Sequence, residues 1–214
     1  MVKALITGIS GFAGSFLAEY LFSQKKYFIT GTYLSKGSLS NLTNIIDSLH
    51  LVKVDLTDQK AILQLIGEER PDVVFHLAAL PAVGASFDKP AETIINNVVA
   101  QVHLLEAIRK VGLFNCRILV VSSADVYGKV AKEDLTIDED TEFNPTNAYA
   151  VSKNAQDFLG LQYMLSYNMK IIRARPLNNI GPRQYLGYVV ADFAQKIAKI
   201  EKGLQEPLLT VGNL

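Results

Sequence analysis

The stretch Thr7-Gly8-Ile9-Ser10-Gly11-Phe12-Ala13-Gly14 decides the fold of this chain. An apolar run of strand length precedes it, and a segment with apolar residues at helical spacing follows it. A buried strand therefore enters a glycine turn and leaves it as a helix. Gly8 permits the tight turn, Gly11 lets a phosphate approach the backbone, and Gly14 lets helix and strand pack closely. Because a first helical turn has unpaired N–H groups and a positive dipole end, this context favours a nucleotide-binding turn over an ordinary glycine turn.

The composition indicates an ordinary globular protein. The 214 residues are 49% hydrophobic and 20% charged, which is enough to bury one core. Lys plus Arg and Asp plus Glu both number 21, so we expect no nucleic-acid partner. The apolar runs are strand-sized and no segment resembles a signal peptide or a membrane span, so we expect a cytoplasmic protein without a membrane partner. Cys116 is the only cysteine, which excludes an internal disulfide and fits a reducing compartment.

Apolar runs alternate with helix-patterned segments along the chain. The expected strands, mostly apolar on consecutive positions, are Val2–Thr7, Phe28–Tyr33, Leu49–Val54, Val73–Leu77, Arg117–Ser122 and Lys170–Arg175. The expected helices are Phe12–Gln24, Gln59–Glu68, Ala91–Val111, Ala148–Tyr167 and Val189–Lys202. This alternation predicts an α/β fold, a doubly wound parallel sheet of the Rossmann type with right-handed crossovers.

The end of the second expected strand bears on the choice of cofactor. A fold that grips the adenosine ribose through a carboxylate usually has Asp or Glu at this point. The segment Gly31–Lys36 has neither, and Thr32, Ser35 and Lys36 offer hydroxyls and a positive charge that suit a 2′-phosphate. This favours NADP(H) over NAD(H), which stays the alternative; a polar loop without any ligand would have the same composition.

Two weaker signals come from Asp55 and from the histidines. Asp55 ends the third expected strand and is a candidate acceptor for the adenine amine, while Thr57 and Asp58 are candidate caps of the next helix; both readings are compatible. No metal site is expected, because the spacing of the three histidines does not match metal ligands; they are His50, His76 and His103.

The residues that can carry chemistry are Tyr149, Lys153 and Ser123. Tyr149 and Lys153 are four apart at the start of an expected helix, so the phenol and the ammonium share one face. A free phenol has a pKa of about 10, so it needs a nearby positive charge to exchange protons at neutral pH, and Lys153 supplies one. Such pairs also occur by chance on solvated helices. Ser123 strengthens the assignment, because it follows an apolar strand at the sheet edge where ligands bind.

Taken together, these residues resemble the extended short-chain dehydrogenase/reductases, the NAD-dependent epimerase/dehydratase family. The matching segments run through almost the whole chain in the family's order: Thr7–Gly14, Asp55-Leu56, His76–Ala79, Asn97-Val98, Ser123–Gly128 and Tyr149–Lys153. The resemblance implies that Tyr149 is the acid/base, that Lys153 binds the nicotinamide ribose and lowers the tyrosine pKa, and that Ser123 hydrogen-bonds the reacting sugar oxygen. The residues and the resemblance together give these expected cofactor contacts: Gly8, Gly11, Phe12, Ala13, Gly14, Thr32, Lys36, Asp55, Leu56, Leu77, Ala78, Ala79, Asn97, Tyr149, Lys153 and Pro176.

The C-terminal segment narrows the resemblance. Arg175–Gln184 is similar to the family's segment after the sixth strand, where Asn178 would touch the substrate. Leu186–Ala194 and Val211–Leu214 are similar to segments of the GDP-4-dehydro-6-deoxy-D-mannose reductases, which make GDP-D-rhamnose. The chain departs from the pattern at Pro176-Leu177 and Arg183, and at Ala100-Gln101, where Gly-Thr is usual. The implied substrate-binding residues are Ser86, Ser123, Asp125, Asn178 and Arg183.

The resemblance leads to one main functional hypothesis and two alternatives. The main hypothesis is NADP(H)-dependent reduction of a GDP-linked 4-keto-6-deoxyhexose, with hydride going to C4 while Tyr149 protonates O4. The first alternative is a nucleotide-sugar 4-epimerase or 4,6-dehydratase. Similar dehydratases carry Glu where this chain has the shorter Asp125, which weighs against dehydratase chemistry. The second alternative is a dinucleotide-binding scaffold or sensor without turnover.

The resemblance also bears on domains and assembly. We expect a dinucleotide-binding domain at 1–175, including the catalytic helix, and the start of a substrate-binding lobe at 176–214. Similar proteins continue well beyond such a Val-Gly-Asn-Leu segment, so we expect this chain to be a truncated part. The helix Ala91–Val111 has more apolar surface than one sheet contact needs, and relatives pair through this helix and Ala148–Tyr167. A C2 homodimer is therefore expected.

Overall fold

The structure, a computed structural model, describes residues 1–80, 83–130 and 136–211, with the side chains of 36–38 and 85 outside the description. The chain divides into two compact units, Met1–Asn178 and Asn179–Leu214, and each is treated by itself.

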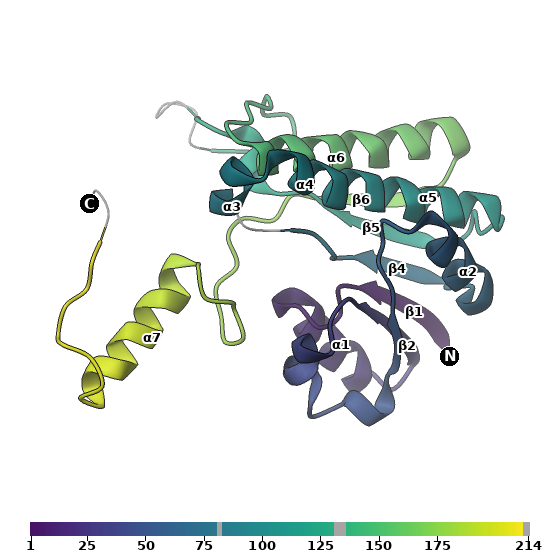
Figure 1. The fold of residues 1–214 in the computed structure, drawn as a ribbon. Coiled ribbons are helices and arrows are strands. Elements are labelled where there is room, and N and C mark those ends of the chain that lie inside the picture. Colours follow the sequence, from purple (N-terminus) through teal and green to yellow (C-terminus); the bar gives the residue numbers. More distant parts are fainter. Residues whose placement is uncertain (81–82, 131–135, 212–214) are drawn as a thin grey trace. The chain divides into compact units, whose positions relative to one another are not determined.

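The first unit is built on a six-stranded parallel sheet with the strand order β3-β2-β1-β4-β5-β6 (Figure 1). The strands are β1 (Val2–Thr7), β2 (Tyr27–Tyr33), β3 (His50–Lys53), β4 (Val73–His76), β5 (Arg117–Val121) and β6 (Lys170–Ala174). All six expected strands are confirmed, with ends that move by one residue at most. The order reverses between β1 and β4, so the ligand crevice of this doubly wound fold lies at the carboxyl ends of those strands.

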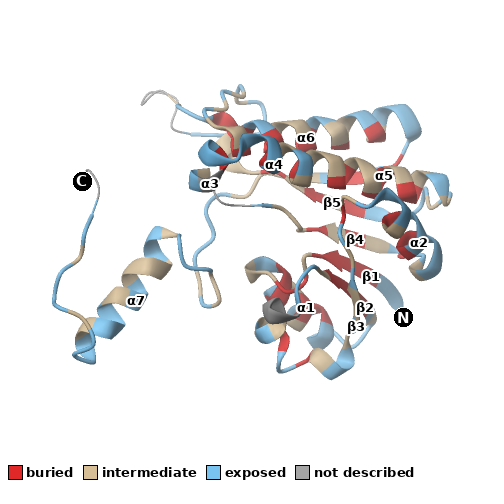
Figure 2. Ribbon diagram, viewed as in Figure 1, coloured by how far each residue is buried: buried red, intermediate tan, exposed pale blue. Residues whose placement is uncertain are grey.

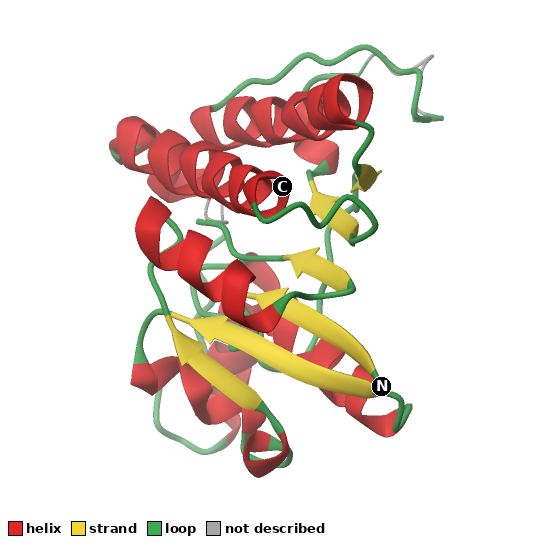
Figure 3. Cartoon of the chain, turned by 90° about the vertical axis from the view of Figure 1, so that its right-hand side faces the viewer, coloured by secondary structure: helices red, strands yellow, loops and turns green. Residues whose placement is uncertain are grey.

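Helices cover both faces of the sheet (Figures 1 and 3). The α-helices of the first unit are α1 (Phe12–Ser23), α2 (Gln59–Glu69), α3 (Val83–Asp88), α4 (Pro90–Ile94), α5 (Ala100–Lys110) and α6 (Ala148–Tyr167). Short 3₁₀ segments are η1 (Lys36–Leu42), η2 (Ile46–Ser48) and η4 (Ala124–Tyr127), and η3 (Ile95–Val99) is a π-helical turn. One core lies between the sheet and α2, α5 and α6, and a second lies between the sheet and α1 with η1.

The alternation of side chains along β1 explains why its sequence is continuously apolar. Leu5 faces the core under α2, α5 and α6, whereas Ala4 and Ile6 face the core under α1. A strand buried on both faces needs apolar residues at every position. Figure 2 shows the result, with buried residues concentrated in the sheet and on the inner sides of the helices.

The expected helix Ala91–Val111 has a different internal geometry from the one predicted. It consists of α4, η3 and α5 in unbroken succession, so a π-helical turn replaces regular helix over Ile95–Val99. Asn97 lies in this turn and is fully buried. Its Oδ1 accepts from the Leu80 N–H at 2.8 Å and its Nδ2 donates to the Ser152 Oγ at 2.9 Å, so tertiary hydrogen bonds hold the widened turn. Helical periodicity carries no signal for them.

The second unit contains α7 (Val189–Glu201), which confirms the last expected helix to within one residue. Asp192 in its first turn accepts from the Gly187 N–H at 2.8 Å, while none of its residues is buried. No helix within the described segments has the length and apolarity needed to cross a membrane.

Candidate active site

The glycine loop has the geometry that its sequence predicts. Gly8 has φ +70°, and a Cβ there would lie 2.9 Å from the Ala78 Cα. A Cβ on Gly14 would overlap the Gly8 carbonyl oxygen, so helix and strand pack too closely for any side chain. A Cβ on Gly11 would meet only that same oxygen, at 3.3 Å. Turn and close packing therefore account for Gly8 and Gly14, and Gly11 is the position with open space in front of it.

The start of α1 fits the pyrophosphate of a dinucleotide. Gly11 is the N-cap residue and provides no side-chain hydrogen bond to the first turn. Helix N-terminal N–H groups without a side-chain acceptor, together with the helix dipole, favour an anionic ligand. The loop is supported from outside by Asn41 of η1, whose Nδ2 donates to the Ser10 carbonyl at 3.1 Å. This support was not foreseen, because η1 lies in a segment without periodicity.

The residues expected to meet a 2′-phosphate occupy different positions. Thr32 is 2% exposed, and its hydroxyl accepts from the Gly8 N–H at 3.3 Å, so it supports the glycine loop from below. Ser35 is exposed and precedes η1. Lys36 begins η1, and its side chain lies outside the described part of the structure. A role for Thr32 and Lys36 at the phosphate stays a prediction.

Asp55 remains exposed at the end of the third strand. Its Oδ1 accepts from the Thr57 N–H at 2.8 Å and from the Thr57 hydroxyl at 2.7 Å, and these bonds lower the pKa of Asp55. The cap of α2 is Asp58, which accepts from the N–H groups of Lys60 and Ala61. Thr57 therefore donates hydrogen bonds to Asp55 and does not cap the helix. Leu56, the neighbour expected near the cofactor, is buried in the core.

The segment after β4 is tied to β1 through Thr7. The Thr7 hydroxyl accepts from the Ala78 N–H at 3.2 Å and lies 2.8 Å from the His76 Nδ1. The Ala78 N–H takes one of the two acceptor positions of the hydroxyl, so the hydroxyl can either donate its hydrogen to Nδ1 or accept a second N–H from it, depending on the His76 tautomer. Burial lowers the pKa of His76 to about 3, and the positive charge of Lys153 acts in the same direction. Leu77 is held by an N–H bond to the Thr7 carbonyl, and Ala79 follows half-buried.

Tyr149 and Lys153 lie together at the start of α6. Asn147 caps this helix by accepting from the Ala150 N–H at 2.8 Å. The Lys153 Nζ is 5.9 Å from the centre of the Tyr149 ring, so the prediction that the two share one helix face is confirmed. Nζ donates to the Val121 carbonyl at 2.9 Å, at the carboxyl end of β5. Burial lowers the pKa of Lys153 from 10.5 to about 8.

Ser123 occupies the same edge of the sheet. It is the N-cap of η4, and its hydroxyl accepts from the Asp125 N–H at 3.2 Å. The preceding Ser122 donates to the Lys153 carbonyl at 3.0 Å. Because Ser122 and Val121 both bond Lys153, the end of β5 and the first turns of α6 are locked together, and Ser123 follows directly from that junction.

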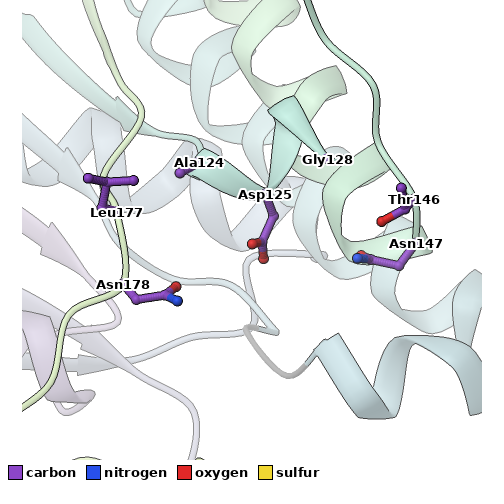
Figure 4. Close-up of a pocket in the computed structure, with 7 residues that line it drawn as sticks. All are labelled: Ala124, Asp125, Gly128, Thr146, Asn147, Leu177 and Asn178. Atoms are coloured by element: carbon purple, nitrogen blue, oxygen red, sulfur yellow. The ribbon is translucent and has the colours of Figure 1, made fainter. Parts of the chain in front are cut away.

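A pocket of about 270 Å³ opens beside this junction (Figure 4). Its lining residues are Ala124, Asp125, Gly128, Thr146, Asn147, Leu177 and Asn178. Figure 4 shows the side chains of Asp125, Asn147 and Asn178 turned toward the same space. The structure thus brings together two expected substrate residues, Asp125 and Asn178. Thr146 and Asn147 were not predicted, although an Asn just before a helical pattern is a capping signal.

Three further expected residues are not among those that line this pocket. Ser86 of α3 is fully buried, and its hydroxyl donates to the Val83 carbonyl at 2.7 Å. The Pro176 carbonyl accepts from the Ala124 N–H at 3.0 Å. Arg183 belongs to the second unit. The described residues also contain no group of three or more His, Cys, Asp or Glu that could hold a metal ion.

A buried ion cluster, not foreseen from the sequence, fastens β6 to α6 and to the segment before it. Asp157 is fully buried and pairs with Arg173 and Arg175. The Arg175 guanidinium also donates to the Tyr127 hydroxyl at 3.1 Å and to the Glu139 carbonyl at 2.8 Å. Arg175, which directly follows β6, therefore connects α6, the last residue of η4 and the middle of the connection between η4 and α6.

The chain is similar to known proteins over almost its whole length. The family model described as GDP-mannose 4,6 dehydratase matches residues 5–214. A GDP-6-deoxy-D-mannose reductase from Pseudomonas aeruginosa is 34% identical, over 99% of this chain and 64% of the relative. A GDP-mannose 4,6-dehydratase from Yersinia enterocolitica is 33% identical, over 100% of this chain and 59% of the relative. The chain thus spans less than two thirds of the length of these curated relatives.

Solved structures show the same likeness. RMD from Pseudomonas aeruginosa complexed with NADPH has a TM-score of 0.80 at 33% identity, over 100% of this chain and 65% of that chain. A dTDP-glucose 4,6-dehydratase from Bacillus anthracis in complex with NAD has a TM-score of 0.81 at 27% identity, over 95% of this chain and 62% of that chain. A UDP-glucose 4-epimerase from Thermotoga maritima with UDP-glucose has a TM-score of 0.84 at 27% identity, over 92% of this chain and 63% of that chain. Fold alone does not choose among these reactions.

Proposed function

The chain belongs to the GDP-mannose 4,6-dehydratase-like family of extended short-chain dehydrogenase/reductases, and on that premise we propose that it reduces the 4-keto group of a GDP-linked 4-keto-6-deoxyhexose. The observation that carries this proposal is the junction of β5 and α6, where Lys153 lies beside Tyr149. Ala124 and Asn147, which lie close to this junction in the sequence, line a pocket together with Asp125 and Asn178. The likeness to a GDP-6-deoxy-D-mannose reductase supports the choice of substrate.

The residues of the junction have complementary parts in the proposed reaction. A reduced nicotinamide, when bound, would supply the hydride for the sugar C4. The Tyr149 phenol gives its proton to the sugar O4, and the Lys153 ammonium favours the phenolate that remains. The Ser123 hydroxyl donates to the same oxygen and orients the carbonyl. The hydroxyl can do so because the Asp125 N–H uses an acceptor position of the oxygen and not the hydroxyl hydrogen.

NADP(H) is the proposed cofactor. The absence of a carboxylate between Gly31 and Lys36 supports it, as does the likeness to a structure complexed with NADPH. NAD(H) is the alternative, because a similar dehydratase is found with NAD. The start of α1 suits the pyrophosphate of either dinucleotide.

A second candidate is 4,6-dehydration of a GDP-hexose, which the Asp125 carboxylate in the pocket favours. A carboxylate there can remove a proton from the sugar ring, although the shorter Asp has less reach than Glu. The likeness to GDP-mannose 4,6-dehydratases also supports it.

The two reactions differ in their cofactor balance, which the test uses. The chain is incubated with NADPH and GDP-4-keto-6-deoxymannose, and separately with NADP⁺ and GDP-mannose. Reduction consumes NADPH in step with the keto sugar, whereas dehydration takes hydride from the sugar onto NADP⁺ and returns it to the same sugar, so GDP-mannose is converted without net consumption of NADP⁺. Turnover of GDP-mannose alone would replace the reductase proposal with the dehydratase. A chain that binds neither dinucleotide would refute both.

We further propose a C2 homodimer that pairs through the α4–α5 segment and α6. Apolar side chains on this surface are exposed in the single chain, and they include Ile95 at 50%, Val151 at 45% and Phe158 at 53%. Such a surface is typical of a protein interface.

A further inference from the structure

A closed set of hydrogen bonds connects α5 to the ammonium of Lys153. The Lys153 Nζ donates to the Gln156 Oε1 at 2.9 Å. The Gln156 Nε2 donates to the Gln101 Oε1 at 2.8 Å, and the Gln101 Nε2 donates to the Gln156 backbone carbonyl at 2.8 Å. Gln101 is 0% exposed, Gln156 is 1% exposed and Lys153 is 5% exposed. All three side chains therefore depend on one another for hydrogen bonds that water would otherwise provide.

The orientation of both carboxamides follows from the lysine. An ammonium has three donors and no acceptor, so the Gln156 atom that faces it must be oxygen. The Gln156 nitrogen then faces Gln101, which must present its own oxygen. The Gln101 nitrogen is thereby left for the Gln156 carbonyl. Each assignment forces the next, and the set has a single arrangement of donors and acceptors.

The set also limits where the ammonium can point. Two of its three hydrogens go to the Val121 carbonyl and to Gln156. Both acceptors are on regular elements, the end of β5 and the third turn of α6. Within the described residues the third hydrogen has no recorded acceptor, so it is available for a ligand that approaches beside Tyr149.

We propose that Gln156, held by Gln101, is a positioning residue that aims the Lys153 ammonium at the nicotinamide ribose and at Tyr149. The proposal rests on the proposed function for the identity of that ligand. Gln156 acts through Lys153 and does not itself touch the substrate.

The charges around Lys153 determine how the proposal can be read out. His76 on β4 interacts electrostatically with it, but with a pKa of about 3 it stays neutral where Lys153 titrates. Tyr149 lies one turn earlier on α6, and Asp125 lies on η4. The groups contributed by β5 and α5, the Val121 carbonyl and Gln101, are uncharged.

The first test follows the titration of Lys153 itself by NMR, with isotope-labelled lysine in the full chain and Lys153→Met to identify the signal. Gln156→Leu removes an acceptor from the charged form and should lower the pKa of Lys153 by about one pH unit. Gln156→Glu keeps an acceptor and adds a negative charge, so it should raise the pKa. Gln101→Leu frees the Gln156 carboxamide to rotate and should cause a smaller lowering.

The matched control is Gln162→Leu, an exposed glutamine on the same helix, which should leave the titration unchanged. An unchanged pKa of Lys153 in folded Gln156→Leu would overturn the proposal. If Gln156→Leu does not fold, Gln156→Glu decides, and an unchanged titration in that variant overturns the proposal equally.

The second test measures affinity for NADPH and for adenosine 2′,5′-bisphosphate, which lacks the nicotinamide ribose. Gln156→Leu should weaken NADPH binding about tenfold near neutral pH and leave the fragment's affinity unchanged, while Gln156→Glu restores NADPH binding. Equal losses for both ligands, or no loss for either, would refute the positioning role. If the wild-type chain binds neither ligand, the proposed function fails, and the Lys153 titration still decides whether Gln156 controls the ammonium.

Discussion

Acidification should destabilise the first unit through His76. This side chain is buried, its Nδ1 faces the Thr7 hydroxyl, and its pKa falls from 6.5 to about 3 on folding. Between these two pKa values, His76 is therefore protonated in the unfolded chain and neutral in the folded chain. The stabilisation is fully present above the unfolded pKa and is lost as the pH falls toward the folded pKa.

The size of the effect follows from the two pKa values. Between about pH 7.5 and about pH 5, His76 alone should cost about 2 kcal/mol of unfolding free energy. Urea unfolding at the two pH values measures it, with wild type compared to His76→Gln. Because the carboxylates titrate alike in both proteins, the difference between their pH dependences isolates His76. Lys153 affects the free energy of unfolding in a separate pH range, because folding lowers its pKa from 10.5 to about 8.

His103→Gln is the control, since His103 is half-buried on α5 and meets only a backbone carbonyl among its recorded contacts. The His103→Gln variant should lose as much free energy of unfolding on acidification as the wild type does. If His76→Gln loses as much stability on acidification as wild type does, His76 is protonated in the folded chain. The account of the Thr7–His76 contact would then be wrong.

Tyr149→Phe should lower kcat about 10²–10⁴-fold while leaving the NADPH dissociation constant nearly unchanged; near wild-type turnover would remove Tyr149 from the acid/base role. Lys36→Ala should weaken NADPH binding about tenfold and NADH binding hardly at all, as measured by fluorescence titration; equal effects on both would exclude a contact with the 2′-phosphate. Ile95→Glu should convert a dimer to a monomer in sedimentation with the unfolding midpoint kept, whereas a wild type that is monomeric at all concentrations would sink the dimer proposal. Gly128→Ala should destabilise the chain by about 2–4 kcal/mol in urea unfolding, because Gly128 has φ +60° and a Cβ would overlap the Asn144 carbonyl oxygen; a loss under about 1 kcal/mol would contradict this.

The sequence predicts those features that depend on local pattern. Strand limits follow from apolar runs, and the conformations of Gly8 and Gly14 follow from the tight strand–turn–helix connection. The Tyr149–Lys153 pair follows from helical spacing alone. Each of these signals lies within a few residues of the feature that it predicts.

Features that join distant segments are not predictable in this way. Gln101 and Gln156 are 55 residues apart, and nothing near either residue indicates that their carboxamides meet. The π-helical turn has a helical sequence, and only the contact of Asn97 with Leu80 and Ser152 distinguishes it. Side-chain pairing of this kind depends on the packing of α5 against α6, which periodicity does not specify.

The contacts of Arg175 bear on how the pocket meets a ligand. Its guanidinium is held by Asp157, bonds Tyr127 and the Glu139 carbonyl, and lies 4.5 Å from the centre of the Phe143 ring. These contacts hold the end of η4, the segment that carries Asp125, so a sugar that binds as proposed would not have to order this segment. Preorganisation of this kind lowers the entropic cost of association. A variant that loosens Arg175 would therefore be expected to slow substrate capture even though Arg175 does not line the pocket.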